Sequence, residues 1–298
     1  MPRINVQIKK IFIPDSERMI LVLRIPEGQN KPYFNNRANK YYKRYNFEAK
    51  EMSESEIEAL YRERFFGVSR LSQYINDVIS FNRSRLPVEN HSIIDGHIIV
   101  TPLRIEDKIM DVKCGGRIAN ELRNVVLDVP DRCPNYLYGI AKPSRYGIRW
   151  NDDHEYKNVE VHRNGLVYCM QDYEDHGHEG EKLYWDYGFA CRLLQTILFS
   201  DAVYSKLNFI GKVKIVIKIF NCMNSQPVSS YTQRPRPRNI ETNSEEIYVE
   251  REWDSWKLKE DRLRIGKSMM DEISNYFGIW TSPTFEEQDN NVRFVWGN

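Results

Sequence analysis

An Asn-Gly pair between two alternating segments most restricts how this chain can fold. Residues 159–163 (VEVHR) and 166–169 (LVYC) alternate between apolar and polar positions, and Asn164-Gly165 separates them. Asn-Gly is the strongest short-range hairpin signal, because both central positions of the favoured two-residue turn need positive φ angles. The chain is therefore expected to contain antiparallel β-structure.

Several other segments have the residue preferences of strands. Residues 212–220 (KVKIVIKIF) place four branched apolar side chains on one face and three lysines, Lys212, Lys214 and Lys218, on the other. Such a lysine row suits a phosphate backbone, or simply the solvated face of a half-buried sheet. Residues 14–17 (PDSE) are turn-like and predict a hairpin between their neighbours. The remaining predicted strands are residues 4–13, 18–25, 40–45, 97–103, 124–129, 136–141 and 246–251.

Helical periodicity alternates with these strands. Ser53 and Glu56 have the spacing of a capping box, and Ile57, Leu60, Tyr61 and Phe65 follow on one face. Gly67 is expected to end this helix, and a second helix follows to about residue 82, with its apolar positions at Leu71, Ile75, Val78 and Ile79. Further helices are predicted over residues 181–206 and over residues 259–277, the last ending at Gly278.

The fold class predicted from these elements is α+β. Residues 1–66 form a first, incomplete α/β unit, residues 67–90 a helical connector, and residues 91–298 a larger mixed α+β domain. The stretch 83–90 is polar and contains Pro87, as a domain boundary does.

Composition excludes several classes of protein. Of 298 residues, 41% are apolar, too many for a disordered chain, and the net charge of +1 requires any phosphate-binding face to be local. No apolar run approaches the ~20 residues that span a bilayer, and no signal peptide opens the chain, so we expect a cytoplasmic protein without membrane contact. Five cysteines without a CxxC pair predict reduced thiols.

A series of short motifs near the N-terminus carries a family resemblance. Residues 21–26 (LVLRIP) are followed by 31–34 (KPYF), 41–44 (YYKR), Met52-Ser53 and Glu56-Ile57. In this order and spacing the segment resembles the back half of a Schlafen/AlbA-type nucleic-acid-binding domain. The resemblance covers roughly a fifth of the chain, about residues 4–65.

This resemblance implies nucleic-acid contact and an incomplete domain. In the family an earlier half, with a Glu-rich strand motif and a glycine-rich turn, precedes these strands, whereas this sequence begins almost directly on them. Three explanations are open: the gene start is truncated, the domain is incomplete, or a second copy of the chain or a partner chain completes it. The hairpin motif at 163–166, residues 273–278 (ISNYFG) and Ser282-Pro283 resemble a C-terminal domain of unknown function in some bacterial members.

Two basic segments are the candidate nucleic-acid contacts. The first interleaves cations with aromatic rings, and positive charge binds phosphates while exposed rings stack unpaired bases; its residues are Arg37, Lys40, Tyr41, Tyr42, Lys43 and Arg44. The alternative is an ordinary strand with tyrosines in the core. The second is a proline-stiffened loop carrying Arg234, Arg236 and Arg238, a chain arm for phosphate contact or else a plain connection.

Catalytic and metal-binding patterns are weak. Asp172, Glu174, Asp175, His176, His178 and Glu179 form the most metal-like cluster, but their spacing matches no established site and favours a solvated acidic loop. GxSxG, HExxH and Walker motifs are missing, so no cofactor, metal or catalytic residue is predicted.

The sequence thus predicts a nucleic-acid-binding protein, for DNA or RNA, acting as a bacterial transcriptional regulator or a defence-associated component. A metal-dependent ribonuclease of the Schlafen type and a protein-interaction module without nucleic-acid binding remain the alternatives.

Overall fold

The chain divides into two compact units, residues 1–70 and residues 71–298. The computed structural model describes residues 7–13, 18–24, 31–45, 48–86, 93–105, 108–110, 115–125, 127–129, 133, 135–151, 157–172, 174–176, 182–228, 241–288 and 291–295.

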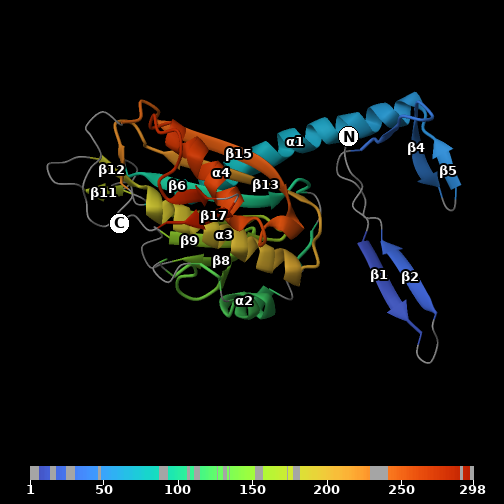
Figure 1. Ribbon diagram of the computed structural model, residues 1–298, viewed down its shortest axis with the longest axis horizontal. Coiled ribbons are helices and arrows are strands. Elements are labelled where there is room, and N and C mark those ends of the chain that lie inside the picture. Colours follow the sequence, from blue (N-terminus) through green and yellow to red (C-terminus); the bar gives the residue numbers. More distant parts are fainter. Residues whose placement is uncertain are drawn as a thin grey trace. The chain divides into compact units, whose positions relative to one another are not determined.

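The first unit contains two small antiparallel sheets and the beginning of a long helix (Figure 1). Strands β1 (Gln7–Phe12) and β2 (Met19–Arg24) pair as the predicted hairpin. Strands β3 (Phe34–Asn35), β4 (Lys40–Tyr45) and β5 (Glu48–Glu51) form a three-stranded sheet, which confirms the strand predicted at 40–45.

Helix α1 (Glu54–Arg83) begins with the predicted capping box. The Ser53 backbone N–H donates to Glu56 Oε2 at 3.0 Å, and the Glu56 N–H points back to Ser53 Oγ at 3.4 Å. The predicted break at Gly67 is wrong, because the helix runs through this residue without a left-handed φ. A glycine weakens a helix by only about 1 kcal/mol, which the apolar contacts of the following turns offset.

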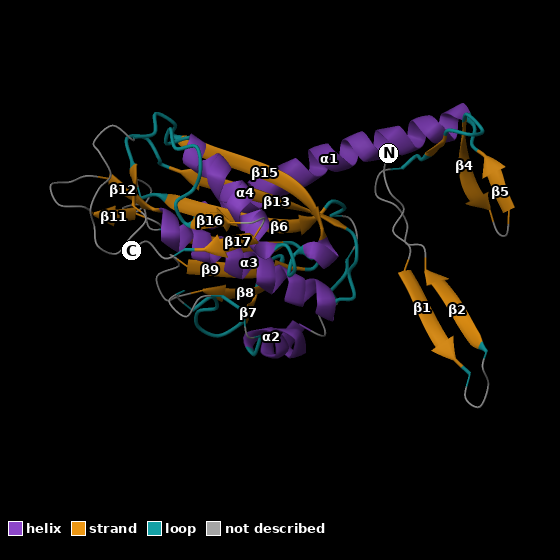
Figure 2. Cartoon of the chain, viewed as in Figure 1, coloured by secondary structure: helices purple, strands orange, loops and turns teal. Residues whose placement is uncertain are grey.

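A seven-stranded antiparallel sheet forms the centre of the second unit (Figure 2). The sheet confirms the α+β class and the strands predicted at 97–103, 212–220 and 246–251. Its order is β15 (Glu246–Asp254), β13 (Lys212–Phe220), β6 (Asp95–Pro102), β10 (Val167–Asp172), β9 (Lys157–His162), β8 (Gly147–Asn151) and β7 (Lys142–Pro143).

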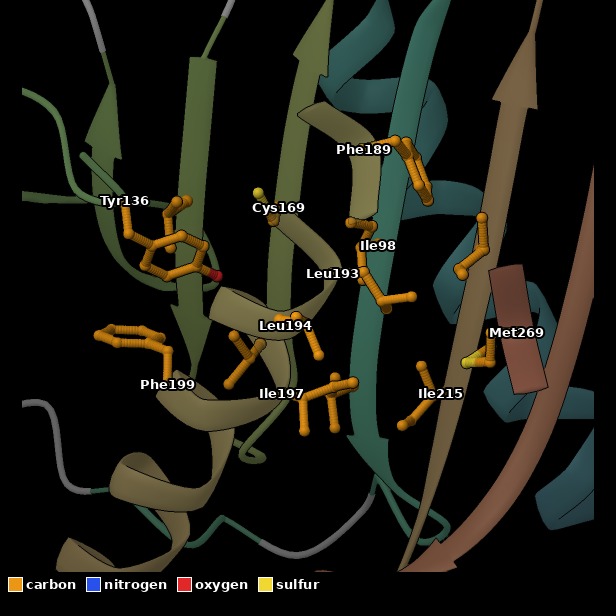
Figure 3. Close-up of a cluster of buried hydrophobic side chains, with 14 of the residues drawn as sticks. Ile98, Tyr136, Cys169, Phe189, Leu193, Leu194, Ile197, Phe199, Ile215 and Met269 are labelled. Atoms are coloured by element: carbon orange, nitrogen blue, oxygen red, sulfur yellow. The ribbon is translucent and has the colours of Figure 1, made fainter. Parts of the chain in front are cut away.

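Helices cover both faces of this sheet. Helices α3 (Asp186–Lys206) and α4 (Arg262–Asn275) pack on one face and bury the larger apolar core. Figure 3 shows Leu193, Leu194 and Ile197 of α3 against Ile98 and Ile215 of the sheet. The second half of α1 covers the other face with a smaller cluster, Leu71, Ile75, Val78, Ile79, Leu86, Ile99, Leu166, Tyr168, Met170 and Val216.

The hairpin at Asn164-Gly165 forms with a different turn from the one expected. Only Gly165 has a positive φ, of 83°, and its N–H donates to the His162 carbonyl at 2.9 Å. The His162 N–H donates to the Leu166 carbonyl at 2.8 Å, so three residues form the loop. A type I turn followed by a left-handed glycine is the usual form of such a three-residue hairpin loop.

The structure corrects three further predictions. The segment 181–206 is not all helix, because Lys182–Trp185 forms strand β12 and pairs in parallel with β14 (Gln226–Val228). No strand forms in the described parts of 124–129 and 136–141. The carbonyls of Asn135 and Tyr136 instead accept hydrogen bonds from the buried Arg192 guanidinium of α3, at 3.0 and 3.2 Å.

Shorter elements complete the second unit. Strand β11 pairs with β12, and strands β16 and β17 form a hairpin. These strands are β11 (Glu174–His176), β16 (Phe285–Gln288) and β17 (Asn291–Phe294). Helix α2 spans Gly115–Arg123, and a 3-10 turn spans Ser255–Lys257. The described helix α4 ends close to the expected C-terminus, and Gly278 has a φ of 71°.

The core on the α3 side should dominate the stability of the second unit. We predict that Leu193→Ala lowers the free energy of unfolding by about 2–5 kcal/mol, because Leu193 is fully buried and its removal leaves a cavity. Ile210→Ala, at a residue with 43% of its surface exposed, is the control and should change it by much less. Urea denaturation followed by circular dichroism measures both; equal losses would contradict the assignment.

Candidate functional site

Strand β4 separates its side chains onto two faces that have different roles. Tyr41, Lys43 and Tyr45 lie on one face, and Lys40, Tyr42 and Arg44 lie on the other, because successive side chains alternate along a strand. Side chains on only one of these two faces can contact the same ligand surface.

The first face packs on the start of α1. The Tyr41 hydroxyl is 2.9 Å from the Tyr61 hydroxyl, and the Lys43 ammonium forms an ion pair with Glu56. The hydrogen bond from Lys43 lowers the pKa of the Glu56 carboxyl. Tyr41 and Lys43 therefore hold the small sheet against the helix, and their role in nucleic-acid contact stays a prediction.

The second face of β4 is open. Tyr42 has 40% of its surface exposed, and Arg44 is also exposed. Lys40 forms an ion pair of 2.6 Å with Glu51, and the hydrogen bond to this carboxylate raises the Lys40 pKa. An exposed ion pair of this kind contributes little energy and leaves the lysine able to exchange partners. This face, Lys40, Tyr42 and Arg44, is called the outer face of β4 below.

The other basic candidates have different surroundings or lie outside the described residues. Arg37 lies in the turn between β3 and β4, where its N–H donates to Asn35 Oδ1 at 3.0 Å. Arg234, Arg236 and Arg238 lie outside the described residues. Two lysines of β13 are paired: Lys214 with Glu250 at 3.1 Å, and Lys218 with Glu246 at 3.2 Å. Lys214 and Lys218 therefore form ion pairs on the sheet face that α1 covers, and their side chains keep only 12% and 18% of their surface exposed.

A metal centre gains no support from the described residues. Among them, no three His, Cys, Asp or Glu side chains are placed to hold a metal ion. Of the acidic and histidine cluster considered from the sequence, His178 and Glu179 lie outside the described part of the chain. None of the helices in the described residues is long and apolar enough to cross a membrane.

Comparison of the chain with protein families, with curated proteins and with solved structures finds no match. The resemblance of residues 4–65 to Schlafen/AlbA-type domains therefore rests on their sequence motifs alone.

A buried polar network between α1 and the large sheet escaped the sequence reasoning. The Tyr168 hydroxyl lies 2.7 Å from His97 Nδ1, and His97 Nε2 lies 2.8 Å from Asp95 Oδ2. A carboxylate only accepts hydrogen bonds, so His97 donates through Nε2 and accepts the Tyr168 hydroxyl at Nδ1. At the end of this row of groups, Arg83 of α1 forms an ion pair of 2.9 Å with Asp95.

The same sequence of groups recurs two strands away. The Tyr74 hydroxyl of α1 lies 2.9 Å from His162 Nδ1, and His162 Nε2 lies 2.8 Å from Glu160 Oε2. Asn158 connects Glu160 to the helix, because its amide donates to Glu160 Oε1 at 3.2 Å and to Asn82 Oδ1 at 2.7 Å.

Tyrosine, histidine and carboxylate in a row can relay protons, but here the groups on the sheet are buried, and only Tyr74 and Arg83 of α1 keep part of their surface exposed. His97, Tyr168, Glu160 and His162 have no exposed surface, so a substrate cannot reach them. Burial also raises the Tyr168 pKa well above its usual value, which keeps the phenol protonated. The network therefore fixes the helix to the sheet.

One thiol differs from the other described thiols. Cys133 is half-buried, and a hydrogen bond with Cys191, together with the charge of Arg192, lowers its pKa. Burial raises the pKa of Cys169, Cys191 and Cys222. Cys133 is thus the most nucleophilic of these four sulfurs.

The buried histidine predicts how stability depends on pH. Burial lowers the pKa of His97 below its usual 6.5, so the unfolded chain binds the proton more readily than the folded one. We predict that stability is fully present above pH 6.5 and is lost as the pH falls from there toward the folded pKa, by up to about 1.4 kcal/mol per pH unit for this group.

Urea denaturation between pH 8 and pH 5 measures this dependence, and His97→Gln provides the comparison. The variant should be less stable at neutral pH and should show a flatter loss toward acid. An identical slope in both proteins would show that His97 does not contribute.

Proposed function

We propose that the first unit binds single-stranded nucleic acid through the outer face of β4. The observation that carries this proposal is an exposed Tyr42 ring on the strand face that α1 leaves uncovered, with Lys40 and Arg44 two residues away on either side. The motif resemblance to Schlafen/AlbA-type domains supports the same ligand class.

The spacing along the strand suits an unpaired strand of nucleic acid. Residues 40 and 44 are separated by about 13 Å along β4, because a strand rises about 3.3 Å per residue. A base stacked on Tyr42 then has a cation on either side for its neighbouring phosphates. In a duplex the bases are already stacked on each other, so an exposed ring favours single-stranded DNA or RNA.

The experiment is a fluorescence-anisotropy titration of the full chain against labelled single-stranded DNA, the same sequence as a duplex, and transfer RNA. Tyr42→Ala should weaken single-strand binding by about 1–3 kcal/mol, roughly five- to 150-fold, through lost stacking. Arg44→Ala should reduce the slope of log affinity against log salt by about 1, because one phosphate contact is lost.

Two control variants make the assignment specific. Arg117→Ala removes an equally exposed arginine of α2 in the second unit and should leave binding unchanged. Tyr41→Phe removes only the hydroxyl that meets Tyr61 and should also bind normally. Wild-type affinity in both Tyr42→Ala and Arg44→Ala would refute the site.

A second candidate function, protein association, is favoured by the β1–β2 hairpin. Ile8 lies opposite Leu23, and Phe12 lies opposite Met19, and all four are at least half exposed. Isolated two-stranded hairpins are marginally stable in water, and exposed apolar strands pair readily with other chains. The titration separates the two functions, since association alone gives no saturable signal with any nucleic acid.

A further inference from the structure

A small cavity belongs to the second unit, and an inference from it does not rest on the proposed nucleic-acid binding. It has a volume of about 110 Å³ and is lined by residues of α2, of β7 and β8, and of the turn after β9. Met110, Ala119, Pro143 and Ile148 make most of its wall apolar, and Lys142 and Arg163 are the two charged residues among the described residues that line it.

The backbone of Arg163 is held firmly at the edge of this cavity. Its N–H donates to the Tyr146 carbonyl at 2.9 Å, and its carbonyl accepts the N–H groups of Ile109 and Met110 at 2.9 and 3.0 Å. These hydrogen bonds connect the Arg163 backbone to the segments of Tyr146 and of Ile109–Met110, and so fix the position of its Cα.

The side chain of Arg163 lacks the partner that such a group usually has. Its Nε is buried and makes no hydrogen bond within the described structure. A buried donor without a hydrogen-bond partner costs free energy, because it has lost its hydrogen bond to water and gained no other. This cost is larger when the donor belongs to a charged group. The Arg163 guanidinium thus has one donor that no described residue satisfies, and Arg163 is one of the residues that line the cavity.

Lys142 supplies a second positive charge at the same cavity. It is exposed on β7, and no ion pair within the described residues involves it. Elsewhere in this unit the sheet lysines do have partners, as Lys214 has Glu250 and Lys218 has Glu246. Among the described residues that line the cavity, Lys142 and Arg163 carry positive charge and none is acidic.

We propose that this cavity binds a small organic carboxylate. The anionic group meets Arg163 and Lys142, and a short hydrocarbon body lies against Met110, Ala119 and Ile148. Inorganic phosphate fits less well, because an ion that is polar on every side would face an apolar wall. The volume is about that of eight water-sized spheres, well below the cavities that hold drug-sized ligands, so the body is a few carbons long.

Isothermal titration of the full chain in a buffer free of carboxylates tests this site, with butyrate as the probe. Butyrate should bind saturably with one site per chain. Butyramide, which has the same shape without the charge, and inorganic phosphate should each bind at least tenfold more weakly. Equal binding of butyrate and butyramide, tighter binding of phosphate, or no saturable butyrate signal at millimolar concentrations would each overturn the proposal.

Variants connect the signal to the two cations. Arg163→Gln should raise the Kd for butyrate at least tenfold. Lys142→Gln should raise it at least threefold, and because Lys142 is exposed this variant keeps the test valid if Arg163→Gln fails to fold. Arg117→Gln removes a charge from α2 outside the cavity lining and should leave the Kd unchanged. Wild-type affinity in Lys142→Gln and in any folded Arg163→Gln would contradict the assignment.

Discussion

The second unit depends on the way its sheet buries polar groups beneath α1. On the face that α1 covers, His97, Glu160 and His162 stand where an ordinary core would have apolar side chains, and none of them has exposed surface. Such groups are tolerated inside a protein only if they are hydrogen-bonded, because an unpaired buried polar group is costly. Here two hydrogen-bonded rows, each of a tyrosine, a histidine and a carboxylate, supply these hydrogen bonds.

Helix α1 supplies partners that these chains need. Tyr74 donates to His162, Asn82 accepts from Asn158, and Arg83 pairs with Asp95. Moving the helix by one residue along the sheet would separate all three contacts, so the polar groups fix its register more sharply than Leu71, Ile75 and Val78 could alone. Because taking ions out of water is costly, such pairs add less to net stability than their contacts alone would suggest.

Local patterns in the sequence predicted the elements whose stabilising contacts are themselves local. The capping box at Ser53 and Glu56, the alternation of residues 212–220 and the β1–β2 hairpin are all present, because each depends on neighbours a few residues away. Predictions failed where distant residues decide. Strand β12 forms because β14 pairs with it. Residues 136–141 form no strand, because Arg192 binds the backbone carbonyls of Asn135 and Tyr136 at the start of this segment.

The same distinction applies to the sites. The basic strand 40–45 was visible from its composition, but its division into a packed face and an open face required the positions of Tyr61 and Glu56. The polar network was not visible, because His97, Glu160 and His162 alternate with apolar residues as exposed positions do. Arg163 was predicted only as the last residue of the strand 159–163, and its unsatisfied buried Nε is visible only in the structure.

Hydrogen–deuterium exchange of the intact chain tests most directly whether the polar network makes the second half of α1 part of the large unit. Described residues of α1 before Leu71 are at most half-buried, whereas Leu71, Ile75, Val78, Ile79 and Asn82 are buried. Amides of residues 71–83 should therefore exchange as slowly as those of β6, and amides of residues 54–66 much faster. Exchange at one uniform, fast rate along the whole helix would contradict this role of the network.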